Sequence, residues 1–313
     1  MARQDDELLA HNRRMDNLFR DLSKLLGYFD TKTVTNVYVY GDGLVEVDDF
    51  DKGTYDSGIF LSIPERERII NSLASVSQTP IDKWTRPTLE SIIPQYNIRT
   101  TAILNPWTQN PEITFRRPAD KIYTLEEYLQ SERISKVLYS KINEHLEKRS
   151  NIVVSGSTGS GKTTFTNALI HKMAELTPDE RFYIVEDVPE LQCSAKKTTQ
   201  LYIRKEQAVT AIQTALRWTP DRIIFGEIRS GEVAVELLEA WNTGHPGNVT
   251  TIHADNASST VTRIEGLLRQ VISGKLPDLR WSIQLIVHLR SRPGFGPVIV
   301  EALTLDEIME GSV

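Results

Sequence analysis

Apolar and polar residues alternate along the chain in two different ways, and the change divides the sequence. Residues 33–63 alternate at every second position around a Gly-Asp-Gly turn, which predicts a β-hairpin followed by a further strand. The segment 64–76 is typical of a helix, and segments 97–104 and 112–117 are strand candidates. From residue 151 onward, apolar runs alternate with helical stretches. We therefore expect an α/β fold with a parallel-rich sheet, preceded by a smaller α+β domain.

The first segment, residues 5–29, has the spacing of an amphipathic helix that ends near Gly27. Its apolar positions are Leu8, Met15, Leu18, Phe19, Leu22, Leu25 and Leu26, and its basic positions are Arg13, Arg14, Arg20 and Lys24. Two interpretations remain open. The helix packs on its own domain or a neighbouring subunit, or it lies flat on an anionic membrane surface.

A boundary between two domains is indicated by Pro118 and the polar residues after it. Thr124 and Glu127 have the spacing of a helix capping box. Residues 131–149 then predict a helix with Ile134, Val137, Leu138, Ile142 and Leu146 on its inner face. The predicted division is an N-terminal helix (1–29), an α+β domain (30–118), a linker (119–130) and a P-loop domain (131–313).

Composition narrows the class of protein. Of the 313 residues, 40% are hydrophobic and 25% are charged, and no apolar run approaches the roughly 18 residues of a membrane span. The net charge of -6 argues against a coat of basic surface for nucleic acid. The single cysteine, Cys193, excludes an intrachain disulfide and favours a reducing, cytoplasmic setting. The first residues lack the pattern of a secretory signal, so we expect no export by that route.

One glycine-rich segment carries the pattern G-x-x-x-x-G-K-[ST], between an apolar run and a predicted helix. Backbone N–H groups in such a loop point into one concavity, and the helix start adds positive charge. Lys162 would neutralise the outer phosphates, and the Thr163 hydroxyl would bind Mg²⁺. The predicted nucleotide-binding residues are Gly156, Ser157, Thr158, Gly159, Ser160, Gly161, Lys162, Thr163 and Thr164.

Polar side chains end three further apolar runs, at Glu186 and Asp187, at Glu227, and at His253 and Asp255. In a parallel sheet these strand ends share the edge where the phosphate loop lies. Two carboxylates and an imidazole around a triphosphate are the groups that hydrolysis needs, to orient water, to act near Mg²⁺ and to contact the γ-phosphate.

The order of these motifs resembles a family, the secretion-superfamily traffic ATPases. After the P-loop come an acidic Asp box (184–191), a Walker B strand (220–229) and a His box (243–255). The chain is most similar to the conjugation and type IV secretion branch, in particular the TrbB-like conjugal transfer ATPases. A single cysteine excludes the tetracysteine motif of type II secretion motors. A type IV pilus assembly or retraction ATPase is the nearest alternative.

The resemblance implies a RecA-like P-loop NTPase domain that binds ATP and Mg²⁺. It makes Glu186 the catalytic carboxylate that activates water, places Glu227 at the Mg²⁺ side through water, and makes His253 the sensor of the γ-phosphate. The resemblance also points to Arg99 and Arg116 of the N-terminal domain as nucleotide contacts, although the neighbouring Arg117 leaves the register open by one. Three motif residues receive no assigned contact: Arg217, Arg229 and His245.

Partners and location follow from the same resemblance. It implies a homo-hexamer at the cytoplasmic face of the bacterial inner membrane. The segment of residues 118–130, between the two predicted domains, is the hinge candidate. The expected partners are other conjugation or type IV secretion components, including the inner-membrane channel and coupling ATPases, with possible peripheral membrane contact.

Two other classes of function are compatible with a phosphate-binding loop. A non-hydrolysing, nucleotide-stabilised scaffold would have no chemical use for the two carboxylates and the imidazole at the strand ends. A DNA translocase or helicase would rely on a basic cluster formed by Lys196, Lys197, Arg204 and Lys205, which is no strong nucleic-acid signal.

Overall fold

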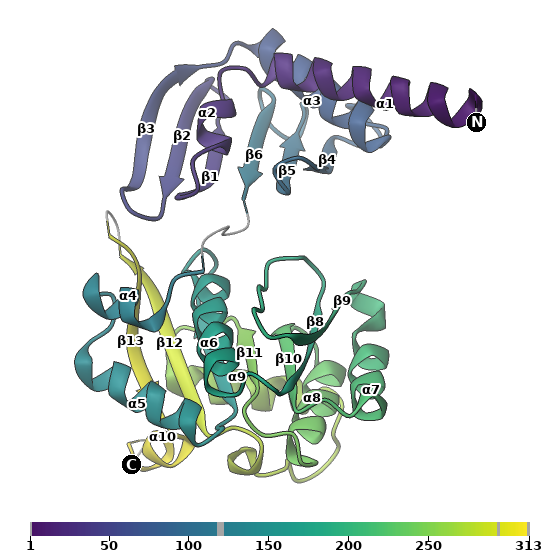
Figure 1. Cartoon of the computed structure of the whole chain (residues 1–313). Coiled ribbons are helices and arrows are strands. Elements are labelled where there is room, and N and C mark those ends of the chain that lie inside the picture. Colours follow the sequence, from purple (N-terminus) through teal and green to yellow (C-terminus); the bar gives the residue numbers. More distant parts are fainter. Residues whose placement is uncertain (1, 118–121, 293–294, 312–313) are drawn as a thin grey trace. The chain divides into compact units, whose positions relative to one another are not determined.

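The structure is a computed structural model and describes residues 2–117, 122–292 and 295–311. It divides into two compact units (Figure 1). Unit 1 comprises Met1–Lys121 with Pro293–Phe295, and unit 2 comprises Ile122–Arg292 with Gly296–Val313.

Unit 1 is an antiparallel sheet covered by helices (Figure 1). Its helices and strands are α1 (Ala2–Asp21), α2 (Leu26–Phe29), β1 (Val34–Val39), β2 (Leu44–Asp49), β3 (Gly53–Phe60), α3 (Ile63–Ser77), β4 (Thr88–Ile93), β5 (Ile98–Ile103) and β6 (Glu112–Arg116). The six strands lie in the order β3-β2-β1-β6-β5-β4. The predicted hairpin, further strand and helix are therefore present, together with both strand candidates.

The apolar side of the N-terminal segment packs inside unit 1. Leu18, Leu22 and Leu25 are fully buried, and they share one core with Phe29 and the apolar face of the sheet. The predicted single helix is interrupted, because α1 ends at Asp21 and α2 begins at Leu26. Of the two interpretations, the structure supports packing on the chain's own domain for residues 15–29. Among the described residues, none of the helices is long and apolar enough to cross a membrane.

Unit 2 is a parallel-rich α/β sandwich, as the sequence predicted. Its elements are α4 (Leu125–Gln130), α5 (Lys136–Glu147), β7 (Ile152–Gly156), α6 (Lys162–Leu176), β8 (Arg181–Glu186), β9 (Lys197–Tyr202), η1 (Lys205–Gln207), α7 (Ala208–Trp218), β10 (Arg222–Glu227), α8 (Gly231–Asn242), β11 (Val249–Ile252), α9 (Ala257–Leu268), η2 (Leu279–Trp281), β12 (Leu285–Arg292), β13 (Gly296–Leu303) and α10 (Leu305–Glu310). The strand order is β13-β12-β7-β11-β10-β8-β9, and only the edge pair β12–β13 is antiparallel among these described strands.

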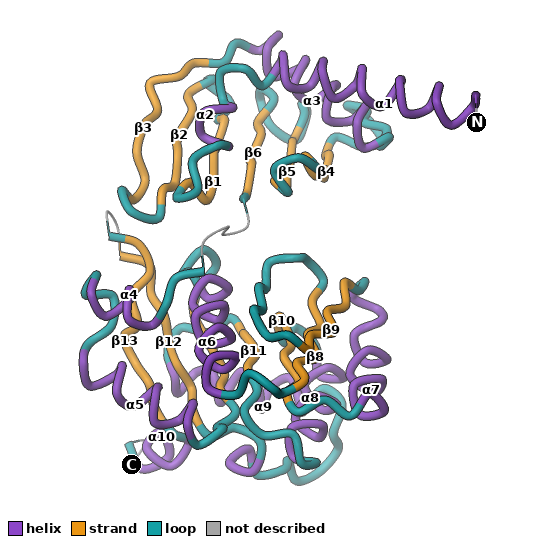
Figure 2. Tube along the Cα trace, viewed as in Figure 1, coloured by secondary structure: helices purple, strands orange, loops and turns teal. Residues whose placement is uncertain are grey.

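Helices cover both faces of this sheet (Figure 2). Helix α6 contacts β7 and β11 on one face, with α4 and α5 packed beside it. Helices α7, α8 and α9 share a core with alternate residues of the strands on the other face, such as Tyr183 and Ile223. Strands that are buried on both faces have continuous apolar sequences. For this reason the sequence predicted β7, β8, β10 and β11.

Two predicted boundaries need correction. The linker expected at 119–130 is shorter, because α4 lies within it and buries Leu125 and Tyr128 in unit 2. Its predicted capping box at Thr124 and Glu127 is present, and residues 118–121 lie outside the described residues.

The helix expected at 131–149 is α5, which begins only at Lys136. Val137 was wrongly placed on its inner face and is 77% exposed. An α-helix turns by about 100° per residue, and Val137 is five residues before the buried Ile142. The two side chains therefore point about 140° apart around the helix axis.

Replacing Leu22 by Ala tests the packing of the N-terminal segment. Because Leu22 is fully buried, truncation should lower the free energy of unfolding of unit 1 by about 2–5 kcal/mol. Leu9→Ala is the matched control, since Leu9 is 51% exposed and its loss should change stability by less than about 0.5 kcal/mol. Urea denaturation followed by fluorescence measures both variants, and equal midpoints would contradict the packing.

Candidate functional site

The parallel strands bring the predicted polar residues to one edge of the unit 2 sheet. β7 lies beside β11, then β10 and β8 follow in order, and these strands all run in the same direction. Gly156, Glu186 and Glu227 are the last residues of β7, β8 and β10, and His253 directly follows β11. The edge predicted to hold the phosphate therefore collects these side chains.

The P-loop connects β7 to α6 and holds Lys162 at the helix start. Lys162 is 8% exposed, and its Nζ donates to the carbonyl oxygens of Gly156, at 3.0 Å, and Ser157, at 2.9 Å. Gly161 has φ +85°, and a Cβ there would lie 2.6 Å from the Cβ of Pro297. The loop thus has the glycine geometry and the buried positive charge that suit a phosphate group.

The remaining predicted loop residues are placed as follows. Ser157, Thr158 and Gly159 are exposed at the loop surface, and Gly159 has φ +73°. Ser160 is fully buried, and Thr164 is half-buried in the first turn of α6. A phosphate on this loop would therefore meet the exposed backbone of residues 157–159 together with the helix start.

A chain of polar contacts runs from Lys162 across the strand ends. Lys162 Nζ lies 3.1 Å from His253 Nδ1, and His253 Nε2 lies 3.2 Å from Glu227 Oε1. The other Glu227 oxygen accepts from Arg229 at 2.9 Å, and Arg229 also pairs with Asp187. The structure thus brings His253 and Glu227 to the P-loop lysine, as the sequence predicted. It also gives Arg229 a contact, which the sequence did not.

Glu186 is held differently, by its own loop. Its Oε2 accepts the backbone N–H groups of Glu190, at 2.9 Å, and Leu191, at 2.8 Å. Its Oε1 accepts from Gln200 Nε2 at 2.6 Å, and the residue is 3% exposed. Burial raises the pKa of Glu186 above its ordinary value, although these hydrogen bonds act in the opposite direction. In this conformation the carboxylate is engaged in shaping the loop.

We call residues 187–192 the Asp-box loop, and it is fastened to α6. Asn167, 1% exposed, donates to the Glu190 carbonyl at 3.0 Å and accepts from the Gln192 N–H at 2.9 Å. Thr163 donates its hydroxyl to Glu190 Oε2 at 3.2 Å. Sequence reasoning did not single out Glu190 or Asn167. Glu190 belongs to the Asp box, so the motif could have identified it as a candidate. Asn167 lies in a predicted helix, and no feature of that helix distinguishes it from its neighbours.

His245 and Arg217 do not join the polar edge. His245 precedes β11, and its Nδ1 lies 2.9 Å from the carbonyl of Pro220, which precedes β10. It therefore sits at the amino ends of the strands, opposite the P-loop. Arg217 is exposed in the last turn of α7.

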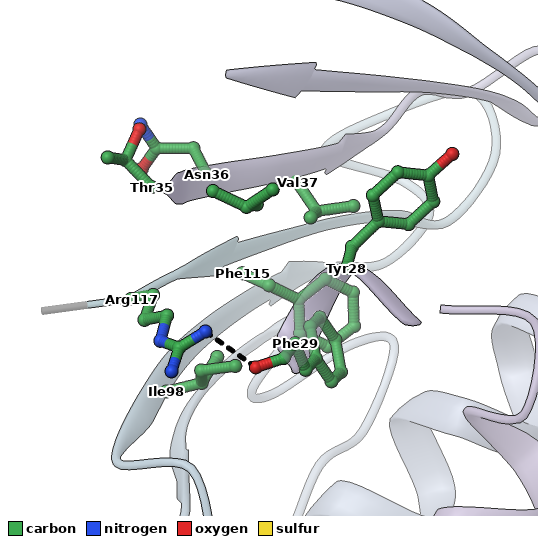
Figure 3. A pocket seen from close by; sticks show the side chains of 9 residues that line it. Tyr28, Phe29, Thr35, Asn36, Val37, Ile98, Phe115 and Arg117 are labelled. Atoms are coloured by element: carbon green, nitrogen blue, oxygen red, sulfur yellow. Dashed lines mark hydrogen bonds between the residues drawn. The ribbon is translucent and has the colours of Figure 1, made fainter. Parts of the chain in front are cut away.

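The two predicted arginines of unit 1 share one face of its sheet. Arg99 and Arg116 are directly opposite each other in the β5–β6 ladder. Arg117 serves the fold instead, because its guanidinium donates to the carbonyl of Phe29 at 2.6 Å (Figure 3). It also donates to the carbonyl of Thr31 at 2.9 Å. Phe29 also belongs to the buried core of unit 1. This geometry selects Arg116 over Arg117 as the residue on the face shared with Arg99.

A parallel sheet with a P-loop and polar strand ends defines a nucleotide-binding α/β protein, and comparison with known proteins narrows the class. Residues 87–291 match the family described as "Type II/IV secretion system protein". The chain belongs to this family, and it is an ATPase of that class. The predicted resemblance to TrbB-like traffic ATPases and the predicted α/β fold with a parallel-rich sheet are both confirmed.

Similar proteins agree with this assignment. The conjugal transfer protein TrbB of Rhizobium radiobacter is 35% identical over 287 residues, which cover 89% of this chain and 88% of that protein. The probable conjugal transfer protein TrbB of Sinorhizobium fredii is 32% identical over 294 residues, with 89% and 88% coverage. In fold, the chain is similar to the ATPase DotB of Legionella pneumophila, with a TM-score of 0.69, 20% identity and coverage of 93% and 82%.

Asn167→Leu tests how firmly the Asp-box loop is fastened. An isosteric apolar side chain removes the partner of the Glu190 carbonyl and of the Gln192 N–H, at a cost of about 1–3 kcal/mol for each group. Hydrogen exchange in residues 187–192 should therefore accelerate. Asn143→Leu in α5 is the control, since its amide donates only within its own helix among the described contacts. Unchanged exchange in the loop would refute the role given to Asn167.

Proposed function

We propose that this chain is the ATP-hydrolysing motor of a conjugal transfer or type IV secretion system, acting as a hexamer at the cytoplasmic face of the inner membrane. The observation that carries the proposal is the contact chain from Lys162 through His253 to Glu227 at the mouth of the P-loop. Similarity to conjugal transfer proteins over most of both chains supports the choice of system.

The P-loop residues bind the triphosphate. The backbone of residues 156–164 surrounds the phosphates, and Lys162 turns from the loop carbonyls toward the outer phosphate oxygens. Oxygen ligands suit Mg²⁺, and Thr163 offers its hydroxyl while Glu227 acts through water. When bound, Mg²⁺ neutralises the phosphate charge and so favours the transfer of the γ-phosphoryl group to water.

His253 and Glu186 act at the γ-phosphate end. Because His253 contacts Lys162 directly, a phosphate that recruits Lys162 also changes the surroundings of His253, which suits a sensor. Glu186 activates the attacking water after one of its loop hydrogen bonds is released. A pKa raised by burial brings its carboxylate closer to the range in which a general base works best.

Motor action requires that the loss of the γ-phosphate moves the chain. Hydrolysis removes the negative charge of the γ-phosphate next to Lys162. Lys162, His253 and Glu227 then return to the contacts they make without nucleotide, and this change can be passed to a hinge. Of the hinge predicted at residues 118–130, residues 118–121 lie outside the described residues, and α4 (Leu125–Gln130) packs in unit 2, so the proposed hinge is confined to the part before α4. Nucleotide contacts by Arg99 and Arg116 stay a prediction, supported by their shared face. Other components of the secretion machinery, including the inner-membrane channel and coupling ATPases, are the proposed partners.

Lys162→Ala should weaken ATP binding by about 10- to 100-fold, because a charged hydrogen-bond donor worth about 1.5–3 kcal/mol is lost. Phosphate release should fall with it. Lys172→Ala on the same helix is the control, since Lys172 pairs with Glu126 and Glu175. Fluorescent-nucleotide titration and a phosphate-release assay measure the two effects. If the purified wild-type hexamer releases no phosphate, the chain is a scaffold and the proposal fails.

Glu186→Gln should keep ATP binding within a few fold and lower turnover by about 10²- to 10⁴-fold, the contribution of a general base. Glu239→Gln, at an exposed position of α8, should leave turnover unchanged. Since Glu186 also shapes the Asp-box loop, hydrogen exchange of residues 187–192 must be compared in parallel. Normal turnover in the Gln variant would dismiss Glu186 as the base.

A further inference from the structure

The Glu190 carboxylate, which is not among the predicted site residues, lies beside Thr163 at the start of α6. Thr163 is the residue whose hydroxyl oxygen binds Mg²⁺ in this loop pattern. In the structure that hydroxyl donates its proton to Glu190 Oε2 at 3.2 Å. A threonine hydroxyl has one proton and two lone pairs, so donating the proton to Glu190 leaves both lone pairs for other partners.

The strand order explains why this carboxylate comes from a loop. β8 is separated from β7 by β11 and β10, so the end of β8 lies about 14 Å to the side of the P-loop strand. Among the described contacts, Glu186, the last residue of β8, makes no hydrogen bond to Thr163, and its carboxylate bonds to its own loop and to Gln200 instead. The Asp-box loop crosses back over this distance and delivers Glu190 to the first turn of α6.

Glu227 is committed elsewhere. One of its oxygens lies 3.2 Å from His253 Nε2 and the other accepts from Arg229 at 2.9 Å. The carboxylate predicted to serve Mg²⁺ therefore takes part in the contact chain to Lys162. In the described structure, Glu190 is the carboxylate with a hydrogen bond to Thr163.

Two backbone contacts help to hold Glu190 in place. Its carbonyl accepts from Asn167 at 3.0 Å, and its N–H donates to Glu186 at 2.9 Å. The side chain is half-buried beside Thr163. Substituting the side chain should therefore leave these two backbone hydrogen bonds available, and hydrogen exchange of residues 187–192 checks that the loop keeps them.

We propose that Glu190 is a positioning residue for Mg²⁺, one that accepts the Thr163 hydroxyl proton and so turns the lone pairs of that oxygen toward the ion. The proposal rests on the ATPase function proposed above. A carboxylate that accepts a hydrogen bond from a ligating group both orients that group and makes it a better donor to the metal. Glu190 then orients Thr163 next to the P-loop, while Glu227 keeps the proposed role of acting on Mg²⁺ through water.

Because Glu190 is negatively charged, its removal should change the affinity for ATP in opposite directions with and without Mg²⁺. Without Mg²⁺, a carboxylate next to the P-loop repels the triphosphate, so removing it should leave ATP binding equal or tighter. With Mg²⁺, the same removal should weaken binding, because the ion loses its oriented ligand. A residue that only stabilised the loop would weaken binding in both conditions.

The experiment compares wild type, Glu190→Ala and Glu190→Gln, with Glu175→Gln as the control on the exposed side of α6. ATP affinity is titrated with excess Mg²⁺ and again with a chelator, and the ratio of the two constants is the readout. We expect the Mg²⁺-dependent gain to fall by about 10- to 100-fold in Glu190→Ala. Glu190→Gln should fall between the two, since its amide carbonyl can still accept the Thr163 hydroxyl.

A wild-type ratio in Glu190→Ala overturns the assignment, and so does equal weakening with and without Mg²⁺. Thermal melting and hydrogen exchange of residues 187–192 report whether the variants keep the loop. Failure of the underlying function looks different, since wild type itself would then release no phosphate from ATP. If wild type hydrolyses ATP while Glu190→Ala keeps its Mg²⁺ dependence, only the role of Glu190 falls.

Discussion

The parallel alignment of β7, β11, β10 and β8 is the constraint on which the site depends. Hydrogen bonds between parallel strands fix a common direction, so residues that follow the strands meet at one edge. The same alignment also sets the distance of each strand end from the P-loop. Ile252 is paired with Ser155 on the neighbouring strand, whereas Glu186 stands three strands away. The edge beside the P-loop is therefore built both from strand ends and from a loop that returns across the sheet.

Two networks meet at Lys162 and the first turn of α6. One joins Lys162 to His253, Glu227 and Arg229, and it places the Glu227 carboxylate between the imidazole and the Arg229 guanidinium. The other joins Thr163 and Asn167 to the Asp-box loop. Glu186 stabilises this loop by accepting the backbone N–H groups of Glu190 and Leu191. A phosphate would compete for Lys162 in the first network, while a cation would approach through Thr163 in the second. Nucleotide binding could thus be registered by two separate strand ends.

In unit 1, successive side chains of β6 point to opposite faces of the sheet, and this alternation distinguishes an arginine on the surface from one that stabilises the fold. β6 alternates its buried residues, Ile113 and Phe115, with exposed ones, and Arg116 falls on the exposed side next to Arg99 of β5. Arg117 follows the strand and turns back to the carbonyls that close α2. Adjacent arginines therefore have unrelated tasks, which a motif alignment uncertain by one position could not separate.

The amino-acid sequence by itself determined the parallel sheet, the P-loop between β7 and α6, and the class of ATPase, because each depends on local periodicity or on a contiguous motif. It also predicted that Glu227 and His253 would reach Lys162, since strand direction alone implies a shared edge. Only the tertiary structure decided that Glu186 is enclosed by its own loop, that Glu190 bonds to Thr163, and that His245 lies at the far edge. These outcomes depend on the order of the strands in the sheet and on the path of a loop. Neither of them changes the spacing of apolar and polar residues in the sequence.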